Sequence, residues 1–316
     1  MAQWLMLSSP SPNLPDSPLS ASASPEDLAA IRARIDRLDD AIHDLLLARA
    51  ELVAGLAQSG AKRGTPFRPA REAQILRRLL ARHHGPLAKT TLVGVWHELL
   101  VGMTRIQAPF SVAVWSPAPG AGYVALAREQ FGSATPVRWL RSAPQVLHAV
   151  ASGDVSVGVL PLPEDVAEAE GGAEPWWTSL LHGETSGLSV VCRLPFVTLR
   201  PEGAPTVSAL VVAALAPEPS GEDRSLIGFE GPSSMSRAAL ADLVVVSGFT
   251  VHRLVTRRRD PGPVSCLAEV DGLVSPEDPR LTRLARAGAA RLCVLGAWPV
   301  PPPDSAFAPS PQDAAK

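Results

Sequence analysis

Apolar residues recur at intervals of three and four positions over about thirty residues near the start of the chain. They are Leu28, Ile31, Ile35, Leu38, Ile42, Leu45, Leu52 and Leu56. Neither Gly nor Pro interrupts the pattern before Gly55, and the spacing predicts one long amphipathic helix. Ser24 can cap its first turn, where Pro25 fits because the first turn leaves its N–H groups unbonded.

The predicted helix is too long to be buried by short neighbours from its own chain. About thirty residues at ~1.5 Å each span ~45 Å. An apolar stripe of that length favours packing against a helix of a second chain. We therefore expect this part of the chain to form a dimer.

Two shorter helical patterns follow, over about 70–83 and about 87–107. The segment from Gly60 to Pro66 separates the first pattern from the second, and Gly85-Pro86 separates the second from the third. Residues 25–109 are therefore predicted to form an all-α module of three helices.

After Pro109 the hydrophobic period changes from helical to alternating. A βαβαβ pattern, typical of a parallel α/β sheet, is followed by a Pro- and Gly-rich stretch, 161–222, that is irregular apart from two apolar strands. A βαββαβ pattern comes next. The predicted strands are 111–115, 137–140, 155–160, 188–192, 208–215, 225–229, 250–256, 264–270 and 291–295, and the predicted helices are 123–130, 143–151, 235–246 and 279–287.

These patterns predict a multi-domain chain in which the all-α module is followed by an α/β region. The expected divisions are a disordered tail, the helical module, a first α/β region, a second α/β region and another disordered tail. Their bounds are 1–24, 25–109, 110–222, 223–300 and 301–316.

Composition narrows the function only slightly. The chain has 316 residues, of which 46% are hydrophobic and 19% are charged, and this composition excludes a disordered or collagen-like chain. The helical module carries a net charge of +4 and the rest, from residue 110, a net charge of −5. A small anionic ligand or a merely solvated basic face both fit this charge, and neither requires nucleic acid.

The cysteines and the N-terminal segment indicate the cellular compartment of the protein. Cys192, Cys266 and Cys293 are odd in number and lie outside any metal-binding spacing, which argues against a disulfide framework and a zinc site and favours the cytoplasm. No apolar run approaches the roughly 18 residues of a membrane span. Residues 1–24 lack Lys and Arg, so we expect no targeting role for them.

Polar residues occupy positions where the helical patterns predict apolar ones. Arg49 lies on the stripe of the first helix, where it needs an anionic partner, either an acid of a neighbouring helix or a ligand. Arg32 lies beside that stripe. Gln107 ends the apolar face of the third helix, as a ligand contact, a core polar contact or a helix-end cap. Arg71-Glu72 opens the second helix, where Glu also suits the helix dipole.

Together these residues carry a resemblance to a known family. The motifs are Leu28-x-x-Ile31-Arg32-x-x-Ile35-Asp36-x-x-Asp39, Leu45-Leu46-x-x-Arg49, Pro69-x-Arg71-Glu72 and the final Gln107. Over about 26–108 they resemble the all-helical class of chorismate mutase. The resemblance implies an intertwined homodimer that converts chorismate to prephenate, a step towards Phe and Tyr, without a cofactor.

The resemblance also implies roles for individual residues. Arg49 and the partner's Arg32 would hold carboxylates, with Arg71 supporting the carboxylate end. Glu72 would bind the ring hydroxyl, and Gln107 would donate to the ether oxygen. Arginine suits such a dicarboxylate because its guanidinium binds carboxylates in a bidentate manner.

The sequence departs from the family at two further positions. Gly60 stands where the family places a lysine aimed at the ether oxygen, and Met103 stands where the family has serine. Lys62 is our favoured replacement for the lysine, with its neighbour Arg63 as the second candidate.

The remainder of the chain is weakly similar to enzymes that join this mutase to further domains. Residues 110–165 resemble the start of a prephenate dehydratase domain, and the region from Ser225 to Pro299 resembles an ACT regulatory domain. The dehydratase motifs are replaced by Pro163-Glu164-Asp165 and Cys192-Arg193-Leu194, so we expect no dehydratase activity. Where the family binds Phe with Gly-Ala-Leu, this chain has Arg237-Ala238-Ala239-Leu240.

Three functions remain open at this point. The favoured one is a homodimeric chorismate mutase with a non-catalytic extension. The second is a regulator or scaffold that retains the mutase dimer without activity. The third is a bifunctional mutase and prephenate dehydratase.

Overall fold

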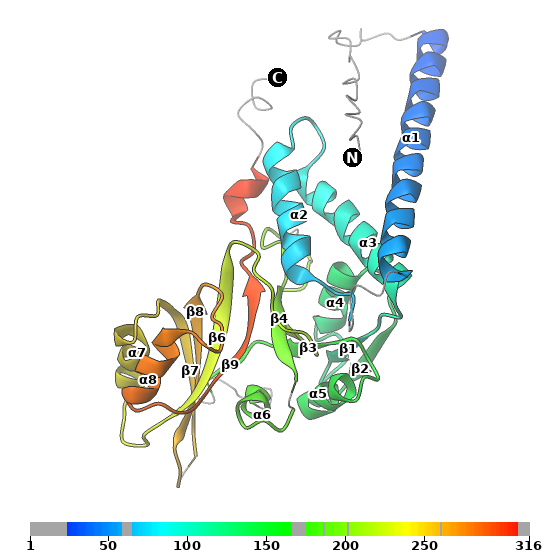
Figure 1. Cartoon of the computed structure of the whole chain (residues 1–316). Coiled ribbons are helices and arrows are strands. Elements are labelled where there is room, and N and C mark those ends of the chain that lie inside the picture. The colour runs from blue at the N-terminus through cyan, green and yellow to red at the C-terminus, as the bar shows by residue number, and fades with distance from the viewer. Residues whose placement is uncertain are drawn as a thin grey trace, which may run out of the picture. The chain divides into compact units, whose positions relative to one another are not determined.

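The computed structural model describes residues 24–58, 65–165, 175–185, 187–200, 202–259 and 261–308. Three helices come first: α1 (Pro25–Gln58), α2 (Pro69–Arg82) and α3 (Lys89–Gln107). They are followed by a nine-stranded sheet and its covering helices (Figure 1). This confirms the predicted fold class, a helical module followed by an α/β region. The chain divides into a unit up to Leu52 and a unit from Val53 onwards.

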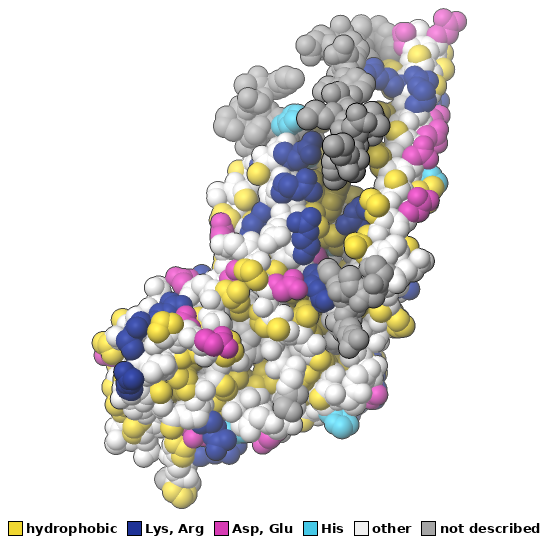
Figure 2. Space-filling model, viewed as in Figure 1, with side chains coloured by type: hydrophobic (Ala, Val, Ile, Leu, Met, Phe, Trp, Pro, Cys, Tyr) yellow, Lys and Arg dark blue, Asp and Glu magenta, His cyan; other side chains and the backbone are white. Residues whose placement is uncertain are grey.

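Helix α1 is continuous over the predicted range and begins where the sequence indicates. The Asp27 backbone N–H donates to Ser24 Oγ (3.2 Å), and the Ser24 N–H donates to the Asp27 carboxylate (3.0 Å). This reciprocal pair resembles a capping box. No residue of the helix is buried, and Leu45 and Leu52 are 72% and 73% exposed. Figure 2 shows hydrophobic side chains along this helix. The partner helix that the sequence leads us to expect for this stripe stays a prediction.

Helices α2 and α3 bury their apolar faces together with segments from the C-terminal part of the chain. Ala73, Leu76 and Leu80 of α2 form a cluster with Val93 of α3. Phe196 and Phe307 complete the same cluster.

The C-terminal segment 301–308 was expected to be part of a disordered tail, and this expectation is wrong for these residues. A short 3-10 helix, η2 (Asp304–Phe307), places Phe307 against α2. Lys89 Nζ donates to the carbonyls of Ala306 and Ala308, both at 2.9 Å. The physical reason is burial of an aromatic side chain, which a Pro-rich composition does not reveal. Residues 1–23 and 309–316 lie outside the described residues.

All nine strands belong to one mixed sheet in the order β2-β1-β3-β5-β4-β9-β6-β8-β7. Strands β2, β1 and β3 are parallel, which confirms the predicted βαβαβ unit, and β9-β6-β8-β7 are antiparallel. The strands are β1 (Val112–Trp115), β2 (Val137–Leu140), β3 (Val157–Pro161), β4 (Ser189–Leu194), β5 (Ala209–Ala213), β6 (Asp223–Gly231), β7 (Val251–Arg258), β8 (Val264–Asp271) and β9 (Ala290–Pro299).

Helices cover both faces of this sheet. Helices α5 (Ala143–Ala151) and α6 (Trp177–Leu181) contribute to one large core, and α4 (Tyr123–Phe131) covers the opposite face of the first strands. Helices α7 (Arg237–Val246) and α8 (Pro279–Arg286) pack on β6–β9 in a separate core, on the face opposite α6. The order β6-α7-β7-β8-α8-β9 confirms the predicted βαββαβ pattern.

The two α/β patterns join where β4 meets β9. Val190 pairs in parallel with Gly296, whose φ is +144°. A Cβ on Gly296 would lie 2.1 Å from the Val190 carbonyl oxygen, so only glycine fits this contact. The boundary expected between 222 and 223 therefore falls inside one continuous sheet.

Helix α6 was not predicted, because its five residues are too few to display a period. It lies in the stretch expected to be irregular. Trp176 and Trp177 are buried there, and the Trp176 indole N–H donates to the Pro161 carbonyl (3.0 Å). The adjacent tryptophans were the available signal.

Among the described residues, no helix is long and apolar enough to cross a membrane.

Candidate active site

Two of the expected site residues, Arg32 and Arg49, lie on the uninterrupted helix α1. Arg32 is exposed, whereas Arg49 is half-buried. They are 17 residues apart, so ~25 Å of helix separates them. The two guanidinium groups of one chain therefore cannot bind opposite ends of the same small molecule.

Glu72 lies in the first turn of α2 with its carboxyl half-buried. Within the described chain, this carboxyl has no hydrogen bond or ion pair. Burial raises the pKa of Glu72 to about 8. A carboxyl in this state, at a helix N-terminus, is suited to bind a polar group that reaches it from outside the chain.

The charge of Glu72 acts on a cysteine of strand β4. Burial and the negative charge of Glu72 together raise the pKa of the Cys192 thiol, which is 3% exposed. Cys192 is therefore an inert, protonated core thiol.

Arg71 precedes Glu72 and points away from the core. It is exposed, and its Nη1 lies 3.5 Å from Oε1 of Gln74. Figure 2 shows Lys and Arg side chains gathered over α2, where Arg71, Arg78 and Arg82 are the exposed arginines. This basic face accounts for part of the positive charge of the helical module.

Gln107 is half-buried at the end of α3, and its Nε2 donates to the Met103 carbonyl at 3.2 Å. This is the helix-end contact that the sequence left open as an alternative. Among the described residues no hydrogen bond joins Gln107 to Arg71 or Glu72. Lys62, with Gly60 and Arg63, lies outside the described residues.

The segment that replaces the first dehydratase motif has a structural role. Asp165 Oδ1 accepts from the Thr256 backbone N–H (2.8 Å), and Arg237 Nη2 lies 2.9 Å from Asp165 Oδ2. Asp165 thus ties the loop after β3 to β7 and α7. Both oxygens of the Asp165 carboxylate therefore have a partner within the protein.

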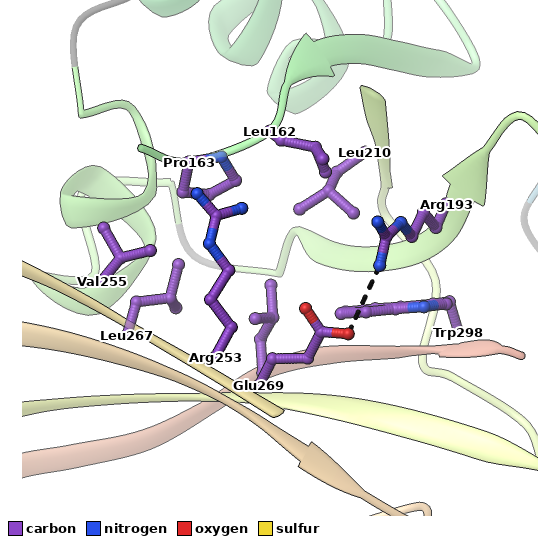
Figure 3. A pocket seen from close by; sticks show the side chains of 10 residues that line it. Leu162, Pro163, Arg193, Leu210, Arg253, Val255, Leu267, Glu269 and Trp298 are labelled. Atoms are coloured by element: carbon purple, nitrogen blue, oxygen red, sulfur yellow. Dashed lines mark hydrogen bonds and ion pairs between the residues drawn. The ribbon is translucent and has the colours of Figure 1, made fainter. Parts of the chain in front are cut away.

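The replacement of the second motif places Arg193 beside a small cavity that the sequence did not indicate. Glu269 Oε1 accepts from Arg193 Nη1 (3.4 Å) and Arg224 Nη1 (2.9 Å). Figure 3 shows Arg253 on the other side of Glu269, with Trp298 below Arg193. The cavity is about 20 Å³, enough for roughly one water molecule. It is too small for a metabolite in this conformation.

The sequence also missed a set of contacts on α2. Arg77 donates four hydrogen bonds, to Ser220, Glu222 and Val300. The only signal was an arginine among the apolar positions of that helix, without an indication of its partners.

Comparison with known proteins identifies the helical module. Residues 31–108, about a quarter of the chain, match the family described as chorismate mutase type II. The matched range includes Arg32, Arg49, Arg71, Glu72 and Gln107. The N-terminal module is therefore a chorismate mutase type II domain.

Two curated relatives carry this domain in longer proteins. Both are described as bifunctional chorismate mutase/prephenate dehydratase. The protein from Pseudomonas aeruginosa is 30% identical over 146 residues, and the protein from Stutzerimonas stutzeri is 29% identical over 143. The matches cover 44% and 43% of this chain but only 40% and 39% of the relatives. This chain therefore spans well under half of either relative.

Among solved structures, a prephenate dehydratase from Streptococcus mutans is similar to part of this chain. The TM-score is 0.44 at 15% sequence identity. The similarity covers 60% of this chain and 97% of that structure.

Proposed function

We propose that this protein is a homodimeric chorismate mutase that converts chorismate to prephenate in aromatic amino acid biosynthesis. The observation that carries the proposal is the mutase domain match over 31–108, which includes the five expected substrate contacts. The half-buried Glu72 carboxyl, without a polar partner in the described chain, supports a ligand at the first turn of α2.

The proposed reaction is a pericyclic rearrangement in which the ether C–O bond breaks as a new C–C bond forms. It needs no nucleophile, general base or cofactor. The protein contributes by holding the compact conformer and by stabilising the negative charge that grows on the ether oxygen. Arg49 of one protomer and the partner's Arg32 would hold the carboxylates, supported by Arg71. Glu72 would bind the ring hydroxyl, and Gln107 and Lys62 would stabilise the ether oxygen.

The distance between Arg32 and Arg49 supports a site shared by two chains. Antiparallel pairing of two α1 helices would bring Arg49 of one protomer to Arg32 of the other. The same pairing would bury the apolar stripe that is exposed on α1. The dimer is then a requirement of the chemistry rather than an accessory to it.

Complementation between two inactive variants tests the shared site. Arg32→Ala and Arg49→Ala should each abolish prephenate formation. A mixed dimer, isolated through two different affinity tags, should regain about half the wild-type activity, because one of its two sites is intact. Failure to regain activity in a verified mixed dimer would contradict the shared site.

For the rest of the chain we propose a non-catalytic extension in two parts, 110–222 and 223–300, that carries out no dehydratase step. The use of Asp165 as a structural tie supports this proposal. Three free cysteines in the described residues fit a cytoplasmic protein.

A second candidate is a regulator or scaffold that keeps the mutase dimer without activity. Gly60 in place of the family lysine favours it, because loss of a charge-stabilising donor typically costs 10²-fold or more in rate. Assays of prephenate and of phenylpyruvate made from chorismate separate the candidates. Prephenate alone indicates a mutase, both products indicate a bifunctional enzyme, and neither indicates the scaffold.

A further inference from the structure

One arginine of α2 is bound by two separate segments of the C-terminal region. Arg77 Nη1 donates to the Ser220 carbonyl (3.1 Å) and to Ser220 Oγ (3.2 Å). Its Nη2 donates to the carbonyls of Glu222 (3.0 Å) and Val300 (2.7 Å). Glu222 precedes β6 and Val300 follows β9. The guanidinium of Arg77 therefore binds the backbone at both the start and the end of the βαββαβ region.

Two neighbours of Arg77 contact the same stretch, which we call the 218–222 segment. Gln74 Nε2 donates to the Pro219 carbonyl (3.1 Å), and Arg68 Nε lies 3.5 Å from Glu218 Oε1. Three polar residues, one before α2 and two within it, thus contact the 218–222 segment in the same order along both segments.

The 218–222 segment is itself fixed. Ser220 is 6% exposed, its N–H donates to Asp223 Oδ2 (2.9 Å) and its Oγ donates to Asp223 Oδ1 (2.6 Å). The Val300 N–H donates to the Glu222 carbonyl (2.8 Å). Because the segment is anchored to the sheet on its far side, it can hold α2 in place.

These contacts reach the expected substrate-binding residues directly. The Gln74 amide accepts from Arg71 through Oε1 and donates to Pro219 through Nε2. Arg71 and Glu72 belong to the same rigid helix as Arg77, within two turns. A shift of α2 against the 218–222 segment would therefore move both residues together.

We infer that Arg77 is a positioning residue of the mutase site, which it serves by fixing α2 to the 218–222 segment and Val300. The inference rests on the proposed function. It gives the non-catalytic C-terminal region a role in the same reaction, as the support on which Arg71 and Glu72 are held. Small displacements of binding groups are costly, since about 1 Å can lower a rate 10²-fold.

Kinetics of Arg77→Ala test the inference, with Arg78→Ala as the matched control. Arg78 is the next residue of the same helix and is exposed. We expect Arg77→Ala to raise the KM for chorismate by about tenfold, because Arg71 and Glu72 are displaced, whereas Arg78→Ala leaves KM unchanged. A purely structural role would lower the active fraction, and hence kcat, without changing KM.

Alkylation of Cys192 provides a readout that is independent of activity. Cys192 is 3% exposed and shares a core cluster with Phe67, two residues before α2, so iodoacetamide can modify it only after this core opens locally. Peptide mass spectrometry should find at least about fivefold faster modification of Cys192 in Arg77→Ala, and no change at Cys266 in the other core. If wild type lacks mutase activity, the proposed function fails, and the Cys192 rates alone decide whether Arg77 holds α2.

Gln74→Ala keeps the test decisive if Arg77→Ala does not fold. Gln74 is exposed, so its loss should leave Tm unchanged while KM rises several-fold. The inference is overturned if the folded variants keep the wild-type KM within about twofold and protect Cys192 as well as Arg78→Ala does.

Discussion

Glu72, in the first turn of α2, lies close enough to Cys192 of β4 for the negative charge of the carboxylate to contribute to the raised pKa of the thiol. The expected hydroxyl-binding carboxyl thus lies near the core cluster that contains Cys192. Its pKa of about 8 follows from burial. Two predictions derive from this placement.

The first prediction concerns stability. Because the folded-state pKa of Glu72 is raised from 4.5 to about 8, the folded protein holds a proton that the unfolded chain releases, and stability falls as pH rises from 4.5 towards 8. Glu72→Gln removes this dependence. Its Tm at pH 8.5 should exceed that of wild type by at least about 2 °C. Glu51→Gln, at an exposed position of α1, serves as control and should not change the profile.

The second prediction concerns activity. If the ionised Glu72 carboxylate accepts the hydrogen bond of the ring hydroxyl, kcat/KM should rise with pH through about 8. Glu72→Gln should be slower by about tenfold or more, with a flat profile over the same range. A wild-type profile that is flat between pH 6 and 9 would contradict this role.

Arg49→Ala should abolish mutase activity, lowering kcat/KM by about 10²-fold or more, while light scattering still detects a folded dimer. The reason is loss of a guanidinium that binds a substrate carboxylate. Arg34→Ala, at an exposed position of the same helix, should retain activity. If Arg49→Ala instead unfolds and wild type binds no dicarboxylate, Arg49 belongs to a structural ion pair.

The missing lysine leads to a prediction about Lys62. Lys62→Met should lower turnover by about tenfold or more without altering the fold, as expected for a lost electrostatic donor, whereas Arg63→Met should have little effect. Unchanged kinetics in both variants and in the double variant would show that neither residue contributes. Gly60→Lys then separates two cases. If Gln107 and the arginines suffice for catalysis, the rate stays the same, whereas an enzyme that is slow because it lacks the lysine becomes faster.

His97 leads to a prediction about acid stability. It is 7% exposed, its ring lies 6.2 Å from that of Phe196, and burial lowers its pKa to about 4. The unfolded chain therefore takes up a proton that the folded protein does not, so stability falls as pH drops from 6.5 to 4. In His97→Leu, Tm should fall less over that range, and exposed His84→Ala should behave as wild type.

Local pattern and tertiary contact account for different parts of this structure. The helical period of α1, the capping by Ser24 and the apolar or alternating runs of the nine strands act within one element, so these elements could be predicted. The pairing of Val190 with Gly296 and the burial of Phe307 depend on residues more than a hundred positions apart, and no local period encodes them. The same is true of the site. The motifs around Arg32, Arg49 and Glu72 carried the resemblance that implies a dicarboxylate substrate, but the contacts of Arg77 with the C-terminal region leave no trace in the sequence.

The contact at Gly296 also decides where this chain can be shortened. Strand β9 is last in the chain, yet it pairs with both β4 and β6. Ending translation before residue 290, or excising 223–300 as a self-contained cassette, would leave β4 with an open edge of unpaired amides and carbonyls, which favours self-association. The α/β region therefore has to be kept or removed as a whole.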